Sequence, residues 1–351
     1  MADVLFFAAL GIAVVALVAS IRRLHRRESS APGGVARVIA ANALVFALLL
    51  CTLLGGAELW LRFGVDASDG LAMTRVGKHW FARHWRLNGV GVRDDVEYGE
   101  RGGLRLEPPA GLRRLTFVGD SVTAAQGVAA VGDRFANRIR AALGPDVEVQ
   151  VFAQVGLETG DHVALLRDLF QRHYRTDLVV LVYFPNDITD LVPAWQASLS
   201  GILSDTSWLH AALRGSYALD FAWWRLQLLS NPAVGRYQDV VRDAYQGEIW
   251  TAQQQRLLAI RDAVHAAGSR FAVVTLPLFD AADQAWQGAM YARIDRFWSD
   301  AGVPHLDLGA RFAGRDPATL VASRWDEHPN AATHAEIAAA MLPFLRGELG
   351  F

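Results

Sequence analysis

The sequence predicts an α/β fold, in which helices cover both faces of a parallel sheet, preceded by two transmembrane helices. From residue 112 onward, strand-like runs alternate with helix-like runs, and this alternation is typical of a parallel sheet. Upstream lie two apolar runs, residues 4–21 and 38–57, each long enough to cross a hydrocarbon core of about 30 Å as a helix. One of these runs could instead be a buried core helix of a soluble protein.

The apolar runs also predict an orientation in the membrane. No basic residue precedes the first run, so a cleavable signal peptide is not indicated. The connection between the runs is rich in arginine, whereas the segment after the second run carries only Arg62 before Arg75. By the positive-inside rule, the arginine-rich connection is cytoplasmic. We therefore expect a two-pass inner-membrane protein whose catalytic domain is extracytoplasmic, in the periplasm if the cell has an outer membrane.

Composition limits the classes of function. The 351 residues carry a formal net charge of -2, so no basic field favours a nucleic-acid partner. Cys51 is the only cysteine and cannot form an internal disulfide.

Changes in the sequence pattern predict three regions. Residues 1–63 hold the two transmembrane helices and the basic loop, 64–110 form a glycine-rich neck that ends at Pro108 and Pro109, and 111–351 form the α/β domain. Within the domain we expect helices at 132–143, 161–174 and 331–347, and strands at 113–119, 147–152, 177–184, 270–276 and 305–308.

An aromatic-rich helical insertion at about 188–268 interrupts the alternation. Such a segment could be a lid over an acyl or sugar substrate, or a face that rests on the membrane. Aromatic residues at this density are also common in protein cores, so a core role stays open.

The first strand of the domain leads to the candidate nucleophile. Its apolar run stops at Gly119 and places Asp120 and Ser121 just beyond the carboxyl end, where open α/β sheets bind ligands. The helix that follows would direct its first N–H groups and its positive dipole end toward the serine oxygen. Gly-Asp-Ser is also an ordinary turn sequence, so the tripeptide alone does not define a catalytic site.

A serine nucleophile needs a base, and the candidate is His328. Pro329 keeps His328 out of helical conformation, on a loop; Asn330 can cap the helix that follows, and Asp326 can orient the imidazole. His334 lies on that helix at a spacing that matches no metal-ligand pattern. We expect His334 to be a structural hydrogen bonder, and we expect neither a metal nor another cofactor.

Acyl transfer also needs hydrogen-bond donors for the oxyanion that develops in the transition state. Two candidates follow the second and third strands. They are Gly156, whose backbone N–H can be approached closely because the residue has no side chain, and Asn186, whose amide donates without adding a charge.

In this order, the blocks resemble the SGNH hydrolases, also called the GDSL family. The resemblance covers about residues 112–347. It implies a flavodoxin-like three-layer α/β/α sandwich, the SGNH hydrolase fold. It also implies Ser121 as nucleophile, His328 as base, and Ser121, Gly156 and Asn186 as the oxyanion donors. The motifs that carry it are Gly119-Asp-Ser121 with Thr123 and Gly127-Val128, then Gly156, Asn186-Asp187 and His328-Pro-Asn330.

Three positions depart from the family's pattern. Phe184 stands where the third block usually begins with glycine, Trp325 where the acid commonly lies, and Thr333 where glycine often precedes the second histidine. Asp326 is therefore the candidate for the acid, and Phe184 could narrow the site.

These features predict a membrane-anchored serine esterase or O-acyltransferase that forms an acyl-enzyme at Ser121. The neck pattern Asn88, Gly91, Arg93 resembles membrane-anchored relatives linked to envelope polysaccharides. That resemblance implies an acylated envelope or exopolysaccharide glycan as the acyl-ester substrate, and a polysaccharide-synthesis or acyl-donor membrane protein as a candidate partner. The alternative is a non-catalytic membrane module of the same fold that binds glycan or scaffolds a polysaccharide-synthesis complex.

Overall fold

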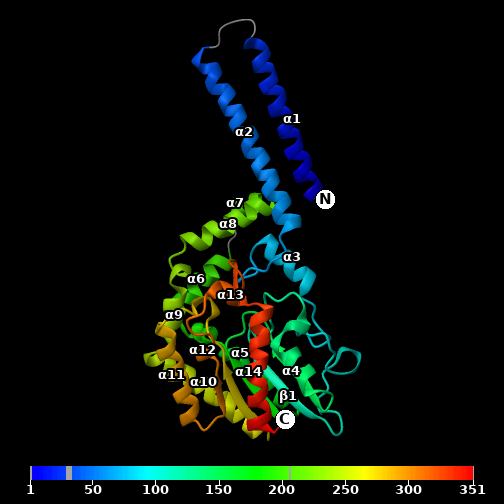
Figure 1. Ribbon diagram of the computed structural model, residues 1–351, viewed down its shortest axis with the longest axis vertical. Helices are drawn as coiled ribbons and strands as arrows, with labels where there is room; N and C mark the ends of the chain where they lie inside the picture. The colour runs from blue at the N-terminus through cyan, green and yellow to red at the C-terminus, as the bar shows by residue number, and fades with distance from the viewer. Residues whose placement is uncertain (1, 29–33, 205–206, 351) are drawn as a thin grey trace. The chain divides into compact units, whose positions relative to one another are not determined.

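The computed structural model describes residues 2–28, 34–204 and 207–350 (Figure 1). The chain forms two compact units. The smaller unit comprises Met1–Asp66, Met73–His79 and Ser204–Ser230, and the larger unit comprises Ala67–Ala72, Trp80–Leu203 and Asn231–Phe351. The expected neck and the aromatic insertion therefore each contribute residues to both units.

A five-stranded parallel sheet forms the centre of the larger unit. Its strands lie in the order β2-β1-β3-β4-β5, which is the flavodoxin-like order. The predicted α/β fold is confirmed, and each of the five expected strands forms. Their bounds are Arg113–Gly119 (β1), Val147–Ala153 (β2), Leu178–Tyr183 (β3), Arg270–Thr275 (β4) and His305–Asp307 (β5).

The strands end together at one edge of the sheet. Gly119 pairs with Ala153, and Tyr183 pairs with Thr275, so that the last residues of neighbouring strands face each other. Because the strands are parallel, the segments that follow β1 to β4 all leave from this edge. It is the edge at which α/β sheets bind their ligands.

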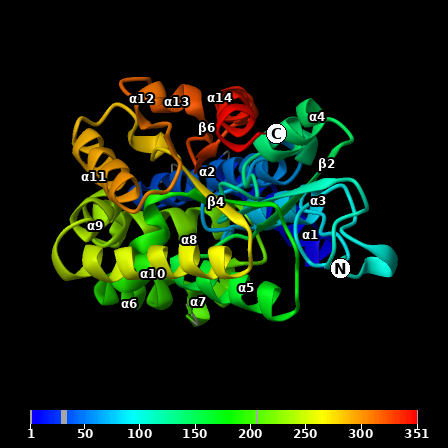
Figure 2. The same ribbon diagram turned by 90° about the horizontal axis from the view of Figure 1, so that it is seen from below.

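Helices cover both faces of the sheet (Figure 2). On one face α5 packs with α10, and on the other α4 packs with α14. Every residue of β3 is 0% exposed between these layers, which explains why its sequence is an unbroken apolar run. The helices are α4 (Phe135–Leu143), α5 (Thr159–Gln171), α10 (Gly247–Ala266) and α14 (Ala331–Leu349).

Further helices and a small hairpin complete the elements around this sheet. A two-stranded antiparallel hairpin, β6–β7, immediately precedes α14. The bounds are α3 (Arg75–His84), α6 (Pro193–Leu203), α9 (Tyr237–Ala244), α11 (Trp286–Asp300), α12 (Gly309–Phe312), α13 (Pro317–Leu320), β6 (Val321–Ser323) and β7 (Asp326–Pro329).

Part of the aromatic insertion belongs to the core of the larger unit. Tyr245 and Trp250 are buried there, and the Tyr245 hydroxyl lies 2.6 Å from that of Tyr183 in β3. The ring of Trp250 contacts Phe297 of α11, with the two ring centroids 5.6 Å apart. Of the alternatives left open for the insertion, Tyr245 and Trp250 therefore have the core role.

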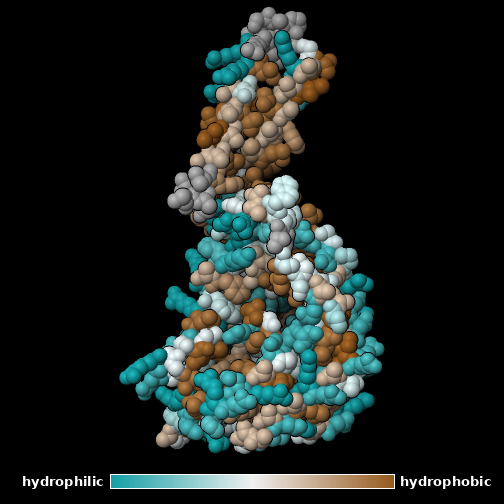
Figure 3. All heavy atoms as spheres, turned by 180° about the vertical axis from the view of Figure 1, so that it is seen from behind, coloured by the Kyte–Doolittle hydropathy of each residue, from teal (hydrophilic) through white to brown (hydrophobic). Residues whose placement is uncertain are grey.

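The smaller unit contains the two long apolar helices, which pack side by side. Each holds a stretch long and apolar enough to cross a membrane, and none of the 18 residues that define that stretch is buried. Figure 3 shows apolar side chains over the outside of this pair, and on α2 they include Phe46, Leu49 and Leu53, all more than half exposed. A core helix of a soluble protein would bury such residues, so the pair agrees with the predicted transmembrane helices. The unit's elements are α1 (Ala2–Glu28), α2 (Val35–Leu59), the π-helical turn Trp60–Gly64, α7 (Trp208–Leu213) and α8 (Tyr217–Ser230).

The predicted basic loop is described only in part, because residues 29–33 lie outside the described residues. At the other end of α2, Arg62 donates to Glu58 at 2.5 Å. The second carboxylate oxygen of Glu58 accepts hydrogen bonds from Ser216 Oγ at 2.7 Å and from the Ala218 N–H at 3.0 Å. Glu58 therefore joins the start of α8 to the end of α2.

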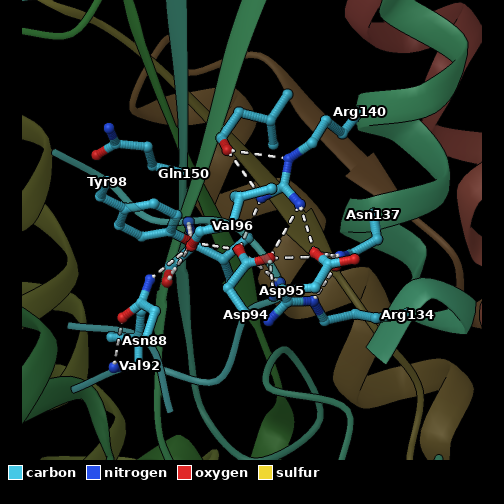
Figure 4. Close-up of polar contacts among 12 residues, drawn as sticks. Asn88, Val92, Asp94, Asp95, Val96, Tyr98, Arg134, Asn137, Arg140 and Gln150 are labelled. Carbon is cyan, nitrogen blue, oxygen red and sulfur yellow. Dashed lines mark hydrogen bonds and ion pairs between the residues drawn. The ribbon is translucent and has the colours of Figure 1, made fainter. Parts of the chain in front are cut away.

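A buried charged network holds residues 88–98 in the larger unit (Figure 4). Asp94 lies 2.9 Å from Arg134 and 2.7 Å from Arg140, and the Tyr98 hydroxyl also donates to it. Burial opposes ionisation of Asp94, but the hydrogen bond from Arg140 and the charges of both arginines outweigh it and lower the pKa of Asp94. This part of the expected neck therefore packs as part of the larger unit.

Candidate active site

Ser121 lies in a tight turn directly after β1. The Oδ1 atom of Asp120 accepts a hydrogen bond from the Val122 N–H at 2.9 Å, which closes the turn. Ala125 then has a φ of 62°, a left-handed conformation that ends any helical path, and α4 begins only at Phe135. The expectation that a helix N-terminus and its dipole meet Ser121 is therefore wrong, because a single turn takes that place.

His328 and Asp326 lie in β7, the second strand of the hairpin, whereas the sequence analysis expected a loop. Asn330 caps α14 as predicted, since its side chain accepts the Thr333 N–H at 2.9 Å. The hairpin and the capped helix together fix where the imidazole lies.

A continuous chain of hydrogen bonds joins three of the predicted site residues. Ser121 Oγ lies 2.7 Å from His328 Nε2, and His328 Nδ1 lies 2.5 Å from Asp326 Oδ1. The same carboxylate oxygen accepts the backbone N–H of His328 at 3.1 Å. This is the mutual geometry that activation of a serine by a general base requires. We call these three residues the relay.

In the relay, Asp326 and His328 each stabilise the charged form of the other. Burial opposes ionisation of Asp326, but the charge of His328 and hydrogen bonds from His328 and Ser68 outweigh it and lower the pKa of Asp326. Burial also disfavours the charged His328, but the charge and hydrogen bond of Asp326 raise the pKa of His328 above its ordinary value. The pair therefore stabilises a proton on His328, the state that forms when the imidazole accepts the proton of Ser121.

The turn that carries Ser121 comes close to the hairpin at Gly127. This residue has a φ of 86°, and a Cβ added to it would lie 2.7 Å from Ala322 Cβ and 3.3 Å from Asp326 Oδ2. Glycine is required both by the left-handed backbone and by the contact. The close approach holds the hairpin against the turn.

Gly156 and Asn186 lie beyond the carboxyl ends of β2 and β3, the two neighbours of β1. Gly156 is exposed, and nothing lies within 4 Å of the position that a Cβ would take. Its φ of 80° is left-handed, so the backbone conformation, and not crowding, favours glycine. Asn186 is half-buried, its side chain interacts with the phenol of Tyr237, and its carbonyl oxygen has no hydrogen-bond partner among the described residues. The donor roles of Gly156 and Asn186 stay predictions.

The positions that depart from the family's pattern leave the relay intact. The Phe184 ring is 9% exposed and stacks on Phe279, with the ring centroids 6.4 Å apart, so it packs in the core. Thr333 is buried, and its hydroxyl donates to the Leu320 carbonyl at 2.8 Å. The family's pattern would place the acid at position 325, but in this chain the carboxylate that binds His328 belongs to Asp326.

A segment of the expected neck joins the site in a way that the sequence did not predict. Ser68 donates a hydrogen bond to Asp326 Oδ2, although the two residues lie far apart in the chain. Gln126, in the turn after Ser121, donates to the carbonyls of Asp69 at 2.9 Å and Gly70 at 3.1 Å. No motif marks these contacts, because they depend on tertiary packing alone.

Arg93 is a second upstream residue at the site. Its guanidinium donates to backbone carbonyls of the turn after Ser121, those of Ala125 and Val128 among them. Its side chain is 1% exposed. Here the sequence held a signal, because Arg93 is part of the neck pattern that resembles membrane-anchored relatives.

Polar and aromatic side chains lie near His328 on the side of the insertion. Asp280, after β4, is close enough to His328 for their charges to interact, and Gln238 of α9 donates to Asp280 at 3.0 Å. Tyr237 lies near Asp280 and Asn186, and its ring centroid is 5.1 Å from that of Trp195. Burial raises the pKa of Tyr237, so its hydroxyl remains a hydrogen-bond donor.

His334 is buried beside the site but outside the relay. Its Nδ1 accepts the Phe135 N–H at 3.4 Å, and its ring stacks on that of Phe135. Burial lowers the pKa of His334 to about 3, so the ring is neutral. These contacts agree with the structural role expected for it. In the part of the chain that the structure describes, no three His, Cys, Asp or Glu residues form a group that could hold a metal ion.

No model of a protein family matches the chain, and no curated protein does either. Several solved structures are similar to it at low sequence identity. Three of them are the lipase Lip_vut3 from a goat rumen metagenome (16% identity, 66% of this chain and 97% of that chain, TM-score 0.43), a member of the lipolytic protein G-D-S-L family from Veillonella parvula DSM 2008 (11%, 66% and 97%, TM-score 0.40) and the acetyl xylan esterase AlAXEase (15%, 66% and 98%, TM-score 0.41).

Two features of the chain itself agree with the family resemblance. The sheet has the strand order that the resemblance implies. Ser121, Gly156 and Asn186 follow β1, β2 and β3, and His328 lies on the last hairpin, so the four blocks stand in the family's order. Both features agree with the resemblance to the SGNH, or GDSL, hydrolases.

Proposed function

We propose that this protein is a membrane-anchored serine esterase or O-acyltransferase that works through an acyl-enzyme at Ser121. The observation that carries the proposal is the relay, in which Ser121 Oγ lies 2.7 Å from His328 Nε2 and Asp326 binds the other ring nitrogen. A serine hydroxyl becomes an effective nucleophile only when a base within hydrogen-bond reach takes its proton.

In the first half-reaction, His328 takes the proton of Ser121 while Oγ attacks the ester carbonyl carbon. The backbone N–H groups of Ser121 and Gly156 and the amide of Asn186 stabilise the oxyanion that forms. The intermediate expels the alcohol, which leaves with the proton from His328. In the second half-reaction, His328 activates water or a sugar hydroxyl, which takes the acyl group and frees Ser121.

The surroundings of His328 support a polar substrate. Asp280, Gln238 and Tyr237 supply hydrogen-bonding groups on one side of the relay, and the Trp195 ring lies next to Tyr237. Hydroxyl-rich sugars need such groups, whereas a long acyl chain needs an apolar wall. With the resemblance in the neck, this favours an acylated envelope or exopolysaccharide glycan as substrate, with an acyl-donor or polysaccharide-synthesis membrane protein as candidate partner.

The proposed location is the inner membrane, with the larger unit in the periplasm or otherwise outside the cytoplasm. It rests on the two long apolar helices and on the arginine-rich connection between them.

The test is turnover of a p-nitrophenyl acyl series by the full-length protein in detergent, with an acetylated glycan as competitor and a free oligosaccharide as acceptor. We expect hydrolysis of the short esters, inhibition by the acetylated glycan, and loss of about 10⁴-fold or more in kcat for Ser121→Ala. Acetylated oligosaccharide among the products would identify a transferase. If the wild type turns over no ester while glycan binding survives Ser121→Ala, the non-catalytic alternative is correct.

A further inference from the structure

The two oxygens of the Asp326 carboxylate have different partners. Oδ1 binds His328, whereas Oδ2 accepts a hydrogen bond from Ser68. Ser68 is 3% exposed and Asp326 is 1% exposed, so water does not compete strongly for either group. A serine hydroxyl has one proton to donate, and Ser68 directs it at the carboxylate.

The segment that carries Ser68 is fixed from two sides. The Gly70 N–H donates to the Trp325 carbonyl at 3.1 Å, next to Asp326 in the hairpin. Gln126, fully buried in the turn after Ser121, binds the carbonyls of Asp69 and Gly70. Residues 67–72 therefore bridge the turn of the nucleophile and the hairpin of the base.

We propose that Ser68 is a positioning residue of the relay, which holds the Asp326 carboxylate in the rotation that directs Oδ1 at His328. The inference rests on the proposed esterase function. The terminal torsion of an aspartate is broad, so a carboxylate held on one side only can turn away from the imidazole. Ser68 comes shortly after Gly64, where the second candidate membrane span ends, so the first residues beyond that span complete the site.

The variant Ser68→Ala removes the donor with little change of volume. We expect kcat to fall about 10- to 100-fold, the range for loss of a hydrogen bond to a charged group, with KM within about twofold of the wild type. The acid limb of the pH profile moves to lower pH, because a carboxylate that turns away from the imidazole holds the proton on His328 less strongly. Ser68→Thr keeps the hydroxyl and restores most of the rate.

The matched control is Ser269→Ala. Ser269 is also buried, and its hydroxyl donates to the Thr176 carbonyl at 2.7 Å, but it lies just before β4, at the opposite edge of the sheet from the site. We expect this variant to keep the wild-type kcat and acid limb. A common loss of activity in both variants would mark a general effect of losing a buried hydrogen bond and would overturn the positioning role.

The decisive measurement is a double-mutant cycle on the full-length protein with p-nitrophenyl acetate, with the melting temperature recorded for each variant. If Ser68 acts through Asp326, Ser68→Ala has no further effect on kcat in an Asp326→Asn background. A loss of equal size in both backgrounds, or a Ser68→Ala kcat within twofold of the wild type, overturns the inference. If Ser68→Ala does not fold, Ser68→Cys, a weak donor of similar size, takes its place in the cycle.

A second readout separates this inference from the proposed function. The pH dependence of His328 modification by diethyl pyrocarbonate, followed by mass spectrometry, reports the pKa of the imidazole without turnover. A wild type without esterase activity would reject the proposed function, whereas an unshifted His328 titration in Ser68→Ala would reject the role of Ser68.

Discussion

Asp326 reaches His328 from two residues upstream because both residues lie in strand β7. In a strand, residues i and i+2 point to the same face, so their side chains are neighbours. The hydrogen bond of 2.5 Å between Asp326 Oδ1 and His328 Nδ1 is the result. The acid commonly lies three residues before the histidine in the family's pattern, but a separation of two residues brings the two side chains together when both lie in one strand.

The first prediction concerns the pH dependence of the relay. Asp326 raises the pKa of His328, so we expect kcat/KM to rise with pH through a value above about 6.5, the ordinary value for imidazole. Below that pKa His328 is protonated and cannot take the proton of Ser121. The paired, protonated form also stabilises the fold at low pH, and this contribution disappears as the pH rises through the folded-state pKa.

The variant Asp326→Asn tests this assignment. It removes the charge that raises the pKa of His328, so the acid limb of kcat/KM should move to lower pH, and kcat should fall by roughly 100-fold or more. Asp295→Asn is the control, because it removes the partner of a different histidine, His305, at 2.9 Å. An acid limb that stays in place in Asp326→Asn would show that His328 is not the titrating base.

At the scale of elements, the sequence predicted the strands well and the connections less well. Leu178–Tyr183 is an apolar run because both faces of the strand are buried, and that property is local. The left-handed conformation of Ala125 and the hairpin that carries His328 depend on contacts with distant residues, such as that of Gly127 with Ala322. The contact of Ser68 with Asp326 is also non-local, so no pattern in the sequence predicted it.

The second prediction concerns the contact between the turn of Ser121 and the hairpin. Gly127→Ala adds a Cβ at 2.7 Å from Ala322 Cβ in a left-handed conformation. We expect a loss of about 1–3 kcal/mol in unfolding free energy and a lower kcat, since the hairpin must move away from Ser121. The control is Gly132→Ala, where nothing lies within 4 Å of the added atom and φ is not left-handed. Urea unfolding and steady-state kinetics measure both effects; equal stability and kcat in the two variants would contradict the account.

The third prediction concerns the buried charges of residues 88–98. Arg134→Met leaves Asp94 buried without one of its two arginines and should lower the unfolding free energy by about 3–5 kcal/mol. Arg138→Met is the control, because its ion pair with Asp133 at 2.6 Å is partly exposed and should contribute within about 1 kcal/mol. Urea unfolding measures the unfolding free energy of both variants. If Arg134→Met loses no more unfolding free energy than Arg138→Met, Arg140 alone is enough to compensate the buried charge of Asp94.

At the scale of the whole molecule, we propose that two membrane-spanning helices anchor a hydrolase outside the cytoplasm. The sequence predicted the pair from length and apolar composition, and α1 and α2 form with their apolar side chains exposed. The predicted orientation of the pair in the membrane depends on the positive-inside rule, because the connection between the two helices is rich in arginine.

The fourth prediction tests this orientation by cysteine labelling in intact cells, in a Cys51→Ser background that removes the native cysteine. Glu107→Cys, at a position 72% exposed, should react with a membrane-impermeant maleimide from outside the inner membrane. Ser30→Cys, in the arginine-rich connection, should react only after the inner membrane is made permeable. The reverse pattern would place the catalytic domain in the cytoplasm.

Above all, we propose that Ser121 is a nucleophile activated by His328. Reaction of the full-length protein with a fluorophosphonate, followed by mass spectrometry of the peptides, measures this directly. We expect one covalent adduct, on Ser121, that is absent in Ser121→Ala and forms far more slowly in His328→Ala. Labelling of Ser121→Ala at the wild-type level, or no adduct on the wild type, would contradict the claim.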